Sequence, residues 1–280
     1  MRDGFAHAIC AITGGAQGIG WATARAFAAH GCRVYIADIS EHHLRDARAL
    51  ADASPWPDRF HFARCDVADQ AQVVAWLAQI YHDAQRIDVL VNNAAFVRWQ
   101  DVLDMSVADV ERTMQVGFNA IVYTTTAVLP HMLAAGHGAI VNMGSAAGRI
   151  FVGGSSAAYA AVKAAVDAYT QTLQVELSRS NVHVMLVRPG TVAGTDFFRT
   201  HVRSSRMPRL ADFVPPVAAD DVAAAIVRGL ERRTPIVDVP GSLRWFYHLF
   251  HVAPSFTRRL VHAGGSARRD FSRPPASNGR

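Results

Sequence analysis

Short apolar segments alternate with helical patterns along most of this 280-residue chain, and no other feature restricts its fold as strongly. Strands are expected at 7–13, 33–38, 59–65, 87–92, 138–143, 182–188 and 235–239. Helices are expected between them at 18–30, 41–52, 69–83, 106–134, 157–179 and 217–232. Strands as apolar as 139–141 are typical of parallel sheets covered on both faces. The pattern predicts an α/β fold, a single doubly wound parallel sheet with right-handed crossovers.

The composition argues against several other classes of protein. The three cysteines have no metal or redox spacing, so we expect buried free thiols in a reducing, cytoplasmic compartment. The histidines form no ligand pattern, so no metal is expected. The apolar run from Ala6 to Ile12 leads straight into a glycine loop, which indicates a first strand and not a signal peptide. No run of about 18 apolar residues is present, so we expect no membrane-spanning segment.

A glycine-rich loop, Thr13–Gly20, follows the first strand and opens the first helix. Glycines at such a position permit a tight turn and let backbone N–H groups approach a pyrophosphate at the helix N-terminus. By itself such a loop is weak evidence for dinucleotide binding, and its position between a strand and a helix makes that evidence stronger. The candidate dinucleotide-binding residues here are Gly14, Gln17, Gly18, Ile19 and Gly20.

An acidic residue ends the second predicted strand, since Asp38 lies 18 residues after Gly20. A carboxylate there accepts hydrogen bonds from both ribose hydroxyls of NAD and repels the extra phosphate of NADP. The neighbouring position is Ile39, and neither 17 nor 39 is an arginine that would bind that phosphate. The alternative is that Asp38 is only an acid at a helix N-terminus.

The chain contains 27 arginines and a single lysine, Lys163, four residues after Tyr159. The i, i+4 spacing places the two side chains on one helix face. A phenol beside an ammonium is a tunable acid–base pair, for which an arginine fork is a poor replacement. The alternative is chance, a leftover lysine on a solvated helix.

These motifs occur together with Asp66-Val67, Asn92-Asn93-Ala94, Ser145 and Pro189-Gly190, in an order that resembles the short-chain dehydrogenase/reductases. The resemblance extends from about residue 6 to residue 240. It implies a Rossmann fold with a seven-stranded sheet in the order 3-2-1-4-5-6-7 and an NAD(P)-dependent oxidoreductase.

The resemblance also assigns roles to residues. Asp66 and Val67 would hold the adenine, and Asn92 to Ala94 would line the cofactor groove. Further contacts, to the nicotinamide end, would come from Pro189, Gly190, Val192 and Thr195.

The implied catalytic residues are Ser145, Tyr159 and Lys163. A free tyrosine has a pKa of ~10, and lowering it to about 7 requires roughly 4 kcal/mol. One positive charge about 4 Å away supplies that at an effective dielectric near 20. Lys163 is therefore expected to lower the pKa of Tyr159, the acid/base, while Ser145 holds the substrate oxygen. The alternative for Ser145 is an ordinary turn serine.

One departure from the family pattern concerns its usual helix asparagine, which here is replaced by Gly117 in Val116-Gly117-Phe118. We hypothesise that the proton relay served by that asparagine persists through backbone and water. Smaller departures are Ala95 in place of glycine, and spacings one residue longer before Tyr159 and before Thr195.

The C-terminal part of the chain is basic, since residues 199–280 contain 14 arginines and 6 acidic residues. The predicted divisions are a catalytic domain over 1–240 with a substrate flap at 194–216, an amphipathic helical extension over 241–264, and a disordered tail over 265–280. The aromatic face of the extension packs on the body or a second subunit, lies in a membrane interface, or roofs the substrate pocket. Nucleic-acid binding is not expected, because no reading module is present.

Together these features predict hydride transfer between NAD(H) and a lipophilic secondary alcohol or ketone, or a long-chain alcohol or aldehyde. A steroid-like or retinoid-like substrate would suit the aromatic extension. The alternatives are an NADP-linked carbonyl reductase and a catalytically weak cofactor-sensing or membrane-associated protein. A homodimer or homotetramer through helices 106–134 and 157–179 is expected from the resemblance.

Overall fold

Seven parallel strands form one sheet in the order β3-β2-β1-β4-β5-β6-β7, which confirms the predicted topology. The computed structural model describes residues 5–150, 156–195 and 216–262. The strands are β1 (Ile9–Thr13), β2 (Arg33–Asp38), β3 (Phe60–Arg64), β4 (Val89–Asn92), β5 (Gly138–Met143), β6 (Val182–Pro189) and β7 (Ile236–Val239). The strand order reverses between β1 and β4, and in doubly wound sheets ligands bind at such a switch point.

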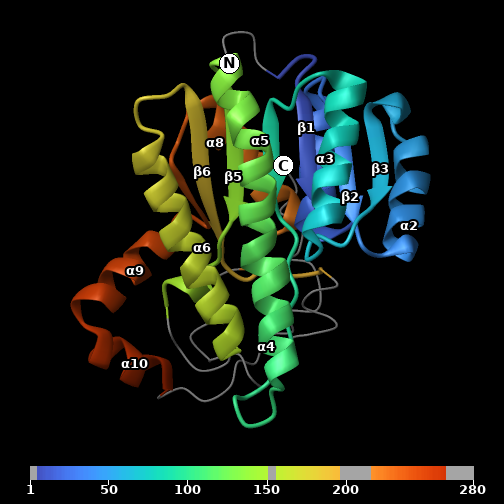
Figure 1. Ribbon diagram of the computed structural model, residues 1–280. Coiled ribbons are helices and arrows are strands. Elements are labelled where there is room, and N and C mark those ends of the chain that lie inside the picture. Colours follow the sequence, from blue (N-terminus) through green and yellow to red (C-terminus); the bar gives the residue numbers. More distant parts are fainter. Residues whose placement is uncertain (1–4, 151–155, 196–215, 263–280) are drawn as a thin grey trace.

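Helices cover both faces of the sheet, as Figure 1 shows with α3, α5 and α6 in front of the strands and α8 behind them. The helices are α1 (Gly18–Ala29), α2 (Glu41–Asp52), α3 (Gln70–Ala84), α4 (Val107–Met114), α5 (Ala120–Ala135), α6 (Ala157–Glu176), α8 (Ala219–Glu231), α9 (Leu243–Val252) and α10 (Pro254–His262). Short turns η1 (Pro57–Arg59) and η3 (Ala146–Gly148) and a π turn, η2 (Gln115–Asn119), complete the described elements.

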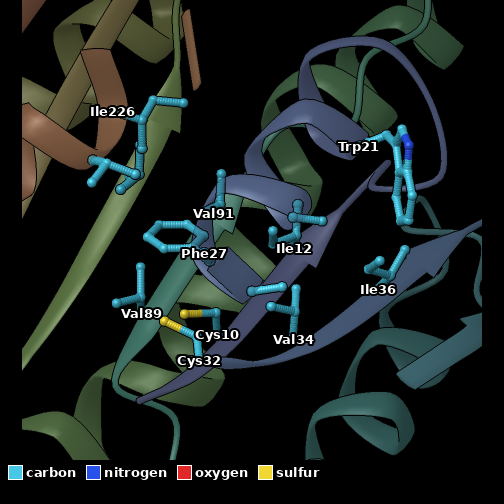
Figure 2. Packing of buried hydrophobic residues seen from close by; sticks show 14 of the residues in the cluster. Cys10, Ile12, Trp21, Phe27, Cys32, Val34, Ile36, Val89, Val91 and Ile226 are labelled. Carbon is cyan, nitrogen blue, oxygen red and sulfur yellow. The ribbon is translucent and has the colours of Figure 1, made fainter. Parts of the chain in front are cut away.

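Two apolar cores lie on the two sheet faces. One packs α1 and α8 on the sheet, and Figure 2 shows Phe27 of α1 among Ile226 of α8 and the β4 residues Val89 and Val91. The other packs α3 and α5 on the opposite face, with Trp76 among its members. The apolar strand segments are buried on both faces, which explains why they lack the alternation of a half-exposed strand.

The strand register brings three chain segments together at one edge of the sheet. Thr13 at the end of β1 pairs with Ala37 of β2 and with Asn92 of β4. The loops that follow these strands therefore meet at the carboxyl edge. On the other side of the switch point, Met143 of β5 pairs with Val187 of β6, so their following turns join the same edge.

The long helix expected at 106–134 is interrupted by the π turn η2, centred on Gly117. A Cβ at Gly117 would lie 2.6 Å from Cγ1 of Val162, so only glycine lets this segment approach α6 so closely. Such π turns are rare and frequently lie at functional sites. The sequence pattern could not show this turn, because its apolar periodicity continues through it.

The C-terminal extension forms α9 and α10, and one face of α9 is buried through Leu243, Tyr247 and Phe250. The three cysteines are free and buried, as predicted. Within the described ranges, every helix is too short or too polar to span a lipid bilayer. Most of the predicted flap (196–215), the last two residues of the predicted extension (263–264) and the whole predicted tail (265–280) lie outside the described residues.

Candidate active site

A cavity of about 310 Å³ opens at the carboxyl edge of the sheet, and most of the predicted site residues line it. The predicted residues in its lining are Gly14, Gln17, Gly18, Ile19, Asp38, Ile39, Asp66, Val67, Ala94, Ser145, Tyr159, Lys163, Pro189, Gly190, Val192 and Thr195. Two predicted residues, Gly20 and Asn92, lie outside the lining.

The glycine loop is held in an open shape by its own backbone and by Asn93. Gly14 has φ +59°, and a Cβ at Gly20 would lie 2.2 Å from the Gly14 carbonyl oxygen. Asn93 Nδ2 donates to the carbonyls of Thr13 (3.1 Å) and Gly14 (2.8 Å). Gly20 thus acts through close packing beneath the loop and not by lining the cavity.

The N-terminus of α1 fits an anionic group. Its N-cap residue, Gln17, makes no side-chain hydrogen bond to the helix, and the first turn contains no acid. The first N–H groups of a helix have no partner within the helix and carry partial positive charge. The buried Oε1 of Gln17 also has no hydrogen-bond partner among the described residues. The loop therefore offers unused backbone donors where a dinucleotide pyrophosphate would lie.

Asp38 lies at the end of β2 and is only 7% exposed. Its carboxylate accepts hydrogen bonds from the backbone N–H of Ala16 (3.3 Å) and of Ser40 (3.1 Å). These bonds fix the carboxylate at the cavity, beside the glycine loop. Its negative charge there opposes a phosphate group and suits a diol.

Asp66 carries a partner that the sequence did not indicate. Arg112 of α4 donates through Nη2 to both carboxylate oxygens of Asp66, at 3.0 and 2.9 Å. Arg112 also lines the cavity. No local pattern joins residues 46 positions apart, so only the tertiary structure reveals this pair.

Asn92 belongs to a buried polar network behind the cavity. Its Nδ2 donates to Asn142 Oδ1 (2.9 Å), and its Oδ1 accepts from the hydroxyl of Thr124 (2.7 Å). Asn142 in turn donates to Thr170 Oγ1 on α6 (3.0 Å). Buried polar groups of this kind need such partners, so Asn92 ties β4 to β5 and α5.

The three candidate catalytic residues come from two neighbouring elements. Ser145 follows β5, whereas Tyr159 and Lys163 occupy successive turns at the start of α6. Ser156 caps this helix by accepting from the Tyr159 N–H (3.5 Å). Lys163 is 3% exposed, and its Nζ donates to the Met143 carbonyl at 2.7 Å and lies 5.7 Å from the Tyr159 ring centre.

The protonation behaviour of this trio differs from the sequence expectation. Burial raises the pKa of Tyr159 to about 12, and a hydrogen bond with Ser145 only partly opposes this. Burial also lowers the pKa of Lys163 to about 8. Desolvation disfavours the charged form of each group, an effect that no sequence motif displays. In the chain alone, the pKa of Tyr159 therefore moves opposite to the direction expected.

An apolar wall stands beside Tyr159. The ring of Trp99 lies 5.7 Å from the Tyr159 ring, centre to centre, at an interplanar angle of 37°. Phe96, Val116 and Met143 add apolar side chains to the cavity lining. Trp99 lies between β4 and α4 and belongs to none of the sequence motifs described above.

A buried ion pair lies directly behind the Pro189-Gly190 turn. Arg188 donates to Asp167 from Nε (2.6 Å) and Nη2 (3.1 Å), and both side chains are almost fully buried. Asp167 lies one turn after Lys163 on α6. The pair therefore joins α6 to the turn that lines the cavity. Among the described residues, no group of histidine, cysteine or acidic side chains is arranged to hold a metal ion.

Comparison with known proteins identifies the family. Residues 8–205 match the family model for short chain dehydrogenase. This chain belongs to the short-chain dehydrogenase/reductase family. Oxidoreductase UcpA of Salmonella typhimurium is 37% identical over 181 residues, 65% of this chain and 68% of that protein. Cis-4-hydroxycyclohexanecarboxylate dehydrogenase of Sinomonas cyclohexanicum is 36% identical over 191 residues, 68% of this chain and 75% of that protein.

The fold comparison agrees. A short-chain dehydrogenase/reductase from Burkholderia phymatum, solved in complex with NAD, superposes with a TM-score of 0.78 at 24% identity, over 91% of this chain and 96% of that chain. This short-chain dehydrogenase/reductase is thus an NAD(P)-dependent oxidoreductase with the fold of its family. Its open glycine loop, uncapped helix and fixed carboxylate fit the dinucleotide that the family uses.

Proposed function

We propose that this short-chain dehydrogenase/reductase transfers hydride between NAD(H) and a lipophilic alcohol or ketone, with Tyr159 as general acid/base. The observation that carries the proposal is that one cavity is lined by Ser145, Tyr159 and Lys163 and also by Asp38. When bound, the dinucleotide supplies the hydride acceptor or donor and, when oxidised, a positive charge.

Side chains of the protein itself bind the substrate oxygen and transfer the proton. Ser145 holds the substrate oxygen beside the phenol, and Tyr159 takes the hydroxyl proton during oxidation or returns it during reduction. Lys163 stabilises the phenolate by its charge. The partly buried position of Tyr159 in the cavity wall strengthens that interaction, because charges interact more strongly at low dielectric.

The preference for NAD over NADP rests on Asp38. The cavity-lining residues next to Asp38 in sequence are Ile39, Ser40 and His43, and the lining arginine, Arg112, already pairs with Asp66. Among the described residues that line the cavity, a 2′-phosphate would therefore meet a fixed carboxylate and no unpaired arginine. An NADP-linked carbonyl reductase is the alternative that this arrangement disfavours.

A lipophilic substrate is supported by the apolar wall of Trp99 and Phe96 next to Tyr159. The dehydrogenase of Sinomonas acts, by its name, on a hydroxylated cyclohexane ring. Cyclic secondary alcohols are therefore the first substrates to assay, followed by steroid-like, retinoid-like and long-chain alcohols.

Cofactor choice is tested by fluorescence titration with NADH and NADPH. Asp38→Ala should weaken NADH binding about 10- to 150-fold, since hydrogen bonds to a charged group contribute about 1.5–3 kcal/mol. The same substitution should also reduce the difference between the affinities for NADH and NADPH. Asp46→Ala, on the exposed surface of α2, is the matched control. Equal NADH binding by wild type and Asp38→Ala would remove the basis for the NAD assignment.

A cofactor-sensing protein of weak activity is the second candidate, and Gly117 is the feature that favours it. Tight dinucleotide binding without turnover on any alcohol of the panel would support this candidate. We further propose a homodimer or homotetramer through α5 and α6, where Leu133 and Val175 are exposed, in the cytoplasm, where free cysteines persist.

A further inference from the structure

The first helix of the C-terminal extension, α9, has two apolar faces. Its inner face packs on the body of the protein: Tyr247 lies under the Arg188 guanidinium, 5.7 Å from ring centre to Cζ, and Leu243 packs beside Gly190. A surface helix needs only this one face to attach it. The apolar residues on its other side therefore require a separate explanation.

The outer side of α9 and α10 forms an exposed apolar stripe, which we call the outer stripe: Trp245, Leu249, Val252 and Phe256. Their exposed fractions are 71%, 39%, 82% and 59%. The spacing of four and three residues places the first three on one side of α9, and Phe256 continues the stripe onto α10. In Figure 1 these two helices stand out from the flank of the sheet beside α6.

The charge around the outer stripe is of one sign. Residues 243–262 contain three arginines and no aspartate or glutamate. Arg244 and Arg259 are exposed. The carboxylate of Asp238 in β7 interacts electrostatically with Arg244. It also forms an ion pair with the buried Arg188, whose Nη1 lies 3.7 Å from Asp238 Oδ1. The extension thus presents exposed aromatic and aliphatic groups together with a net positive charge.

The exposed apolar stripe and the positive charge together indicate which partner binds this surface, a second copy of the chain or a lipid surface. In a two-fold contact between copies of this chain, the same patch meets itself, so arginines would face arginines. Like charges placed opposite each other in an interface are unfavourable. An anionic lipid surface accepts both features, because aromatic side chains insert at the level of the headgroups while arginines bind the phosphates.

We propose that the outer stripe is a docking surface for anionic lipid headgroups, on which this enzyme binds peripherally. Leu243 places α9 directly against the Gly190 turn of the cavity, so docking brings the active site close to the lipid surface. The proposal does not depend on the cofactor or on the substrate assigned above, because lipid binding is measured without either.

Cosedimentation of the full-length protein with vesicles tests the proposal. Binding should be strong to phosphatidylcholine mixed with phosphatidylserine, weak to phosphatidylcholine alone, and reduced by added salt. Trp245→Ser combined with Phe256→Ser should reduce binding at least tenfold, and Arg259→Gln about fivefold. Leu50→Ser, which changes an exposed residue on α2 away from the outer stripe and from the α5 and α6 surface, is the control and should bind like wild type.

The exposed positions of these side chains make misfolding a poor explanation for lost binding, and circular dichroism checks the fold of each variant. Absence of wild-type binding to anionic vesicles, or equal loss in Leu50→Ser, would overturn the proposal. A third result would also overturn the proposal: the wild-type protein dimerises as its concentration rises in light scattering, Trp245→Ser abolishes this dimerisation, and no vesicle binding is seen. The outer stripe would then be assigned to contact with a second copy of the chain.

Discussion

Replacing Lys163 by methionine should raise the pH at which this enzyme oxidises alcohols. Methionine is an unbranched side chain one atom shorter than lysine, and it removes the charge. Lys163 Nζ lies 5.7 Å from the ring centre of Tyr159. Two unit charges at that distance interact by about 3 kcal/mol at an effective dielectric of 20. This corresponds to a change of about 2 in the pKa of the phenol.

The direction follows from the burial of Tyr159. Burial, partly opposed by the hydrogen bond with Ser145, raises its pKa to about 12, so the phenolate is scarce at neutral pH and every positive charge nearby increases its population. The rate of alcohol oxidation should therefore rise with pH through the apparent pKa of the Tyr159–Lys163 pair. Because the pKa of Lys163 is itself about 8, its charge acts on the phenol mainly below that pH. In Lys163→Met the rate at neutral pH should therefore fall about a hundredfold, and the difference from wild type should shrink as the pH rises above 8.

The assay is the initial rate of NADH formation at saturating alcohol and NAD across the accessible pH range. Lys163→Arg retains the charge on a bulkier fork, so its pH profile should stay near that of wild type even where its KM values rise. An unchanged profile midpoint in Lys163→Met, with only KM for NAD increased, would show that the lysine acts by binding alone. The electrostatic argument would then be wrong.

Two further predictions concern stability. Asp167→Asn weakens the partner of the buried Arg188 and should lower the free energy of unfolding by about 3–5 kcal/mol in denaturant titrations, whereas the exposed Asp46→Asn should change it by less than about 0.5 kcal/mol. Gly117→Ala should cost about 1–3 kcal/mol by overpacking against Val162, and a double-mutant cycle with Val162→Ala should recover part of that loss. Additivity in that cycle would argue against the contact.

The features that sequence predicts well here are local ones. The strand ends, the glycine loop and the Tyr159–Lys163 spacing depend on neighbouring residues, and the structure places each within a few positions of the prediction. The roles of the site residues remain predictions until they are measured. The Asn92-Asn93-Ala94 motif predicted that all three residues line the cavity. Asn93 and Ala94 do so, whereas the side chain of Asn92 belongs to a buried hydrogen-bond network.

Features that depend on distant parts of the chain could not be predicted. Arg112 and Asp66 meet only after α4 has folded over the adjoining strand ends, and Trp99 reaches Tyr159 from a loop without periodicity. The raised pKa of Tyr159 is likewise a consequence of burial by many residues. Gly117 shows the same point, since only its contact with α6 explains why a larger residue would be crowded there.

The most direct test of the proposed chemistry is turnover by wild type, Tyr159→Phe and Tyr169→Phe on cyclic secondary alcohols with saturating NAD. Tyr169 lies on the same helix, packs on Phe118 and does not line the cavity, so its loss controls for general effects of removing a phenol hydroxyl. Acid–base catalysis by Tyr159 requires turnover to fall at least a hundredfold in Tyr159→Phe, with NADH binding retained, and to stay near wild type in Tyr169→Phe. Turnover that survives in Tyr159→Phe would contradict the assignment of the catalytic acid/base.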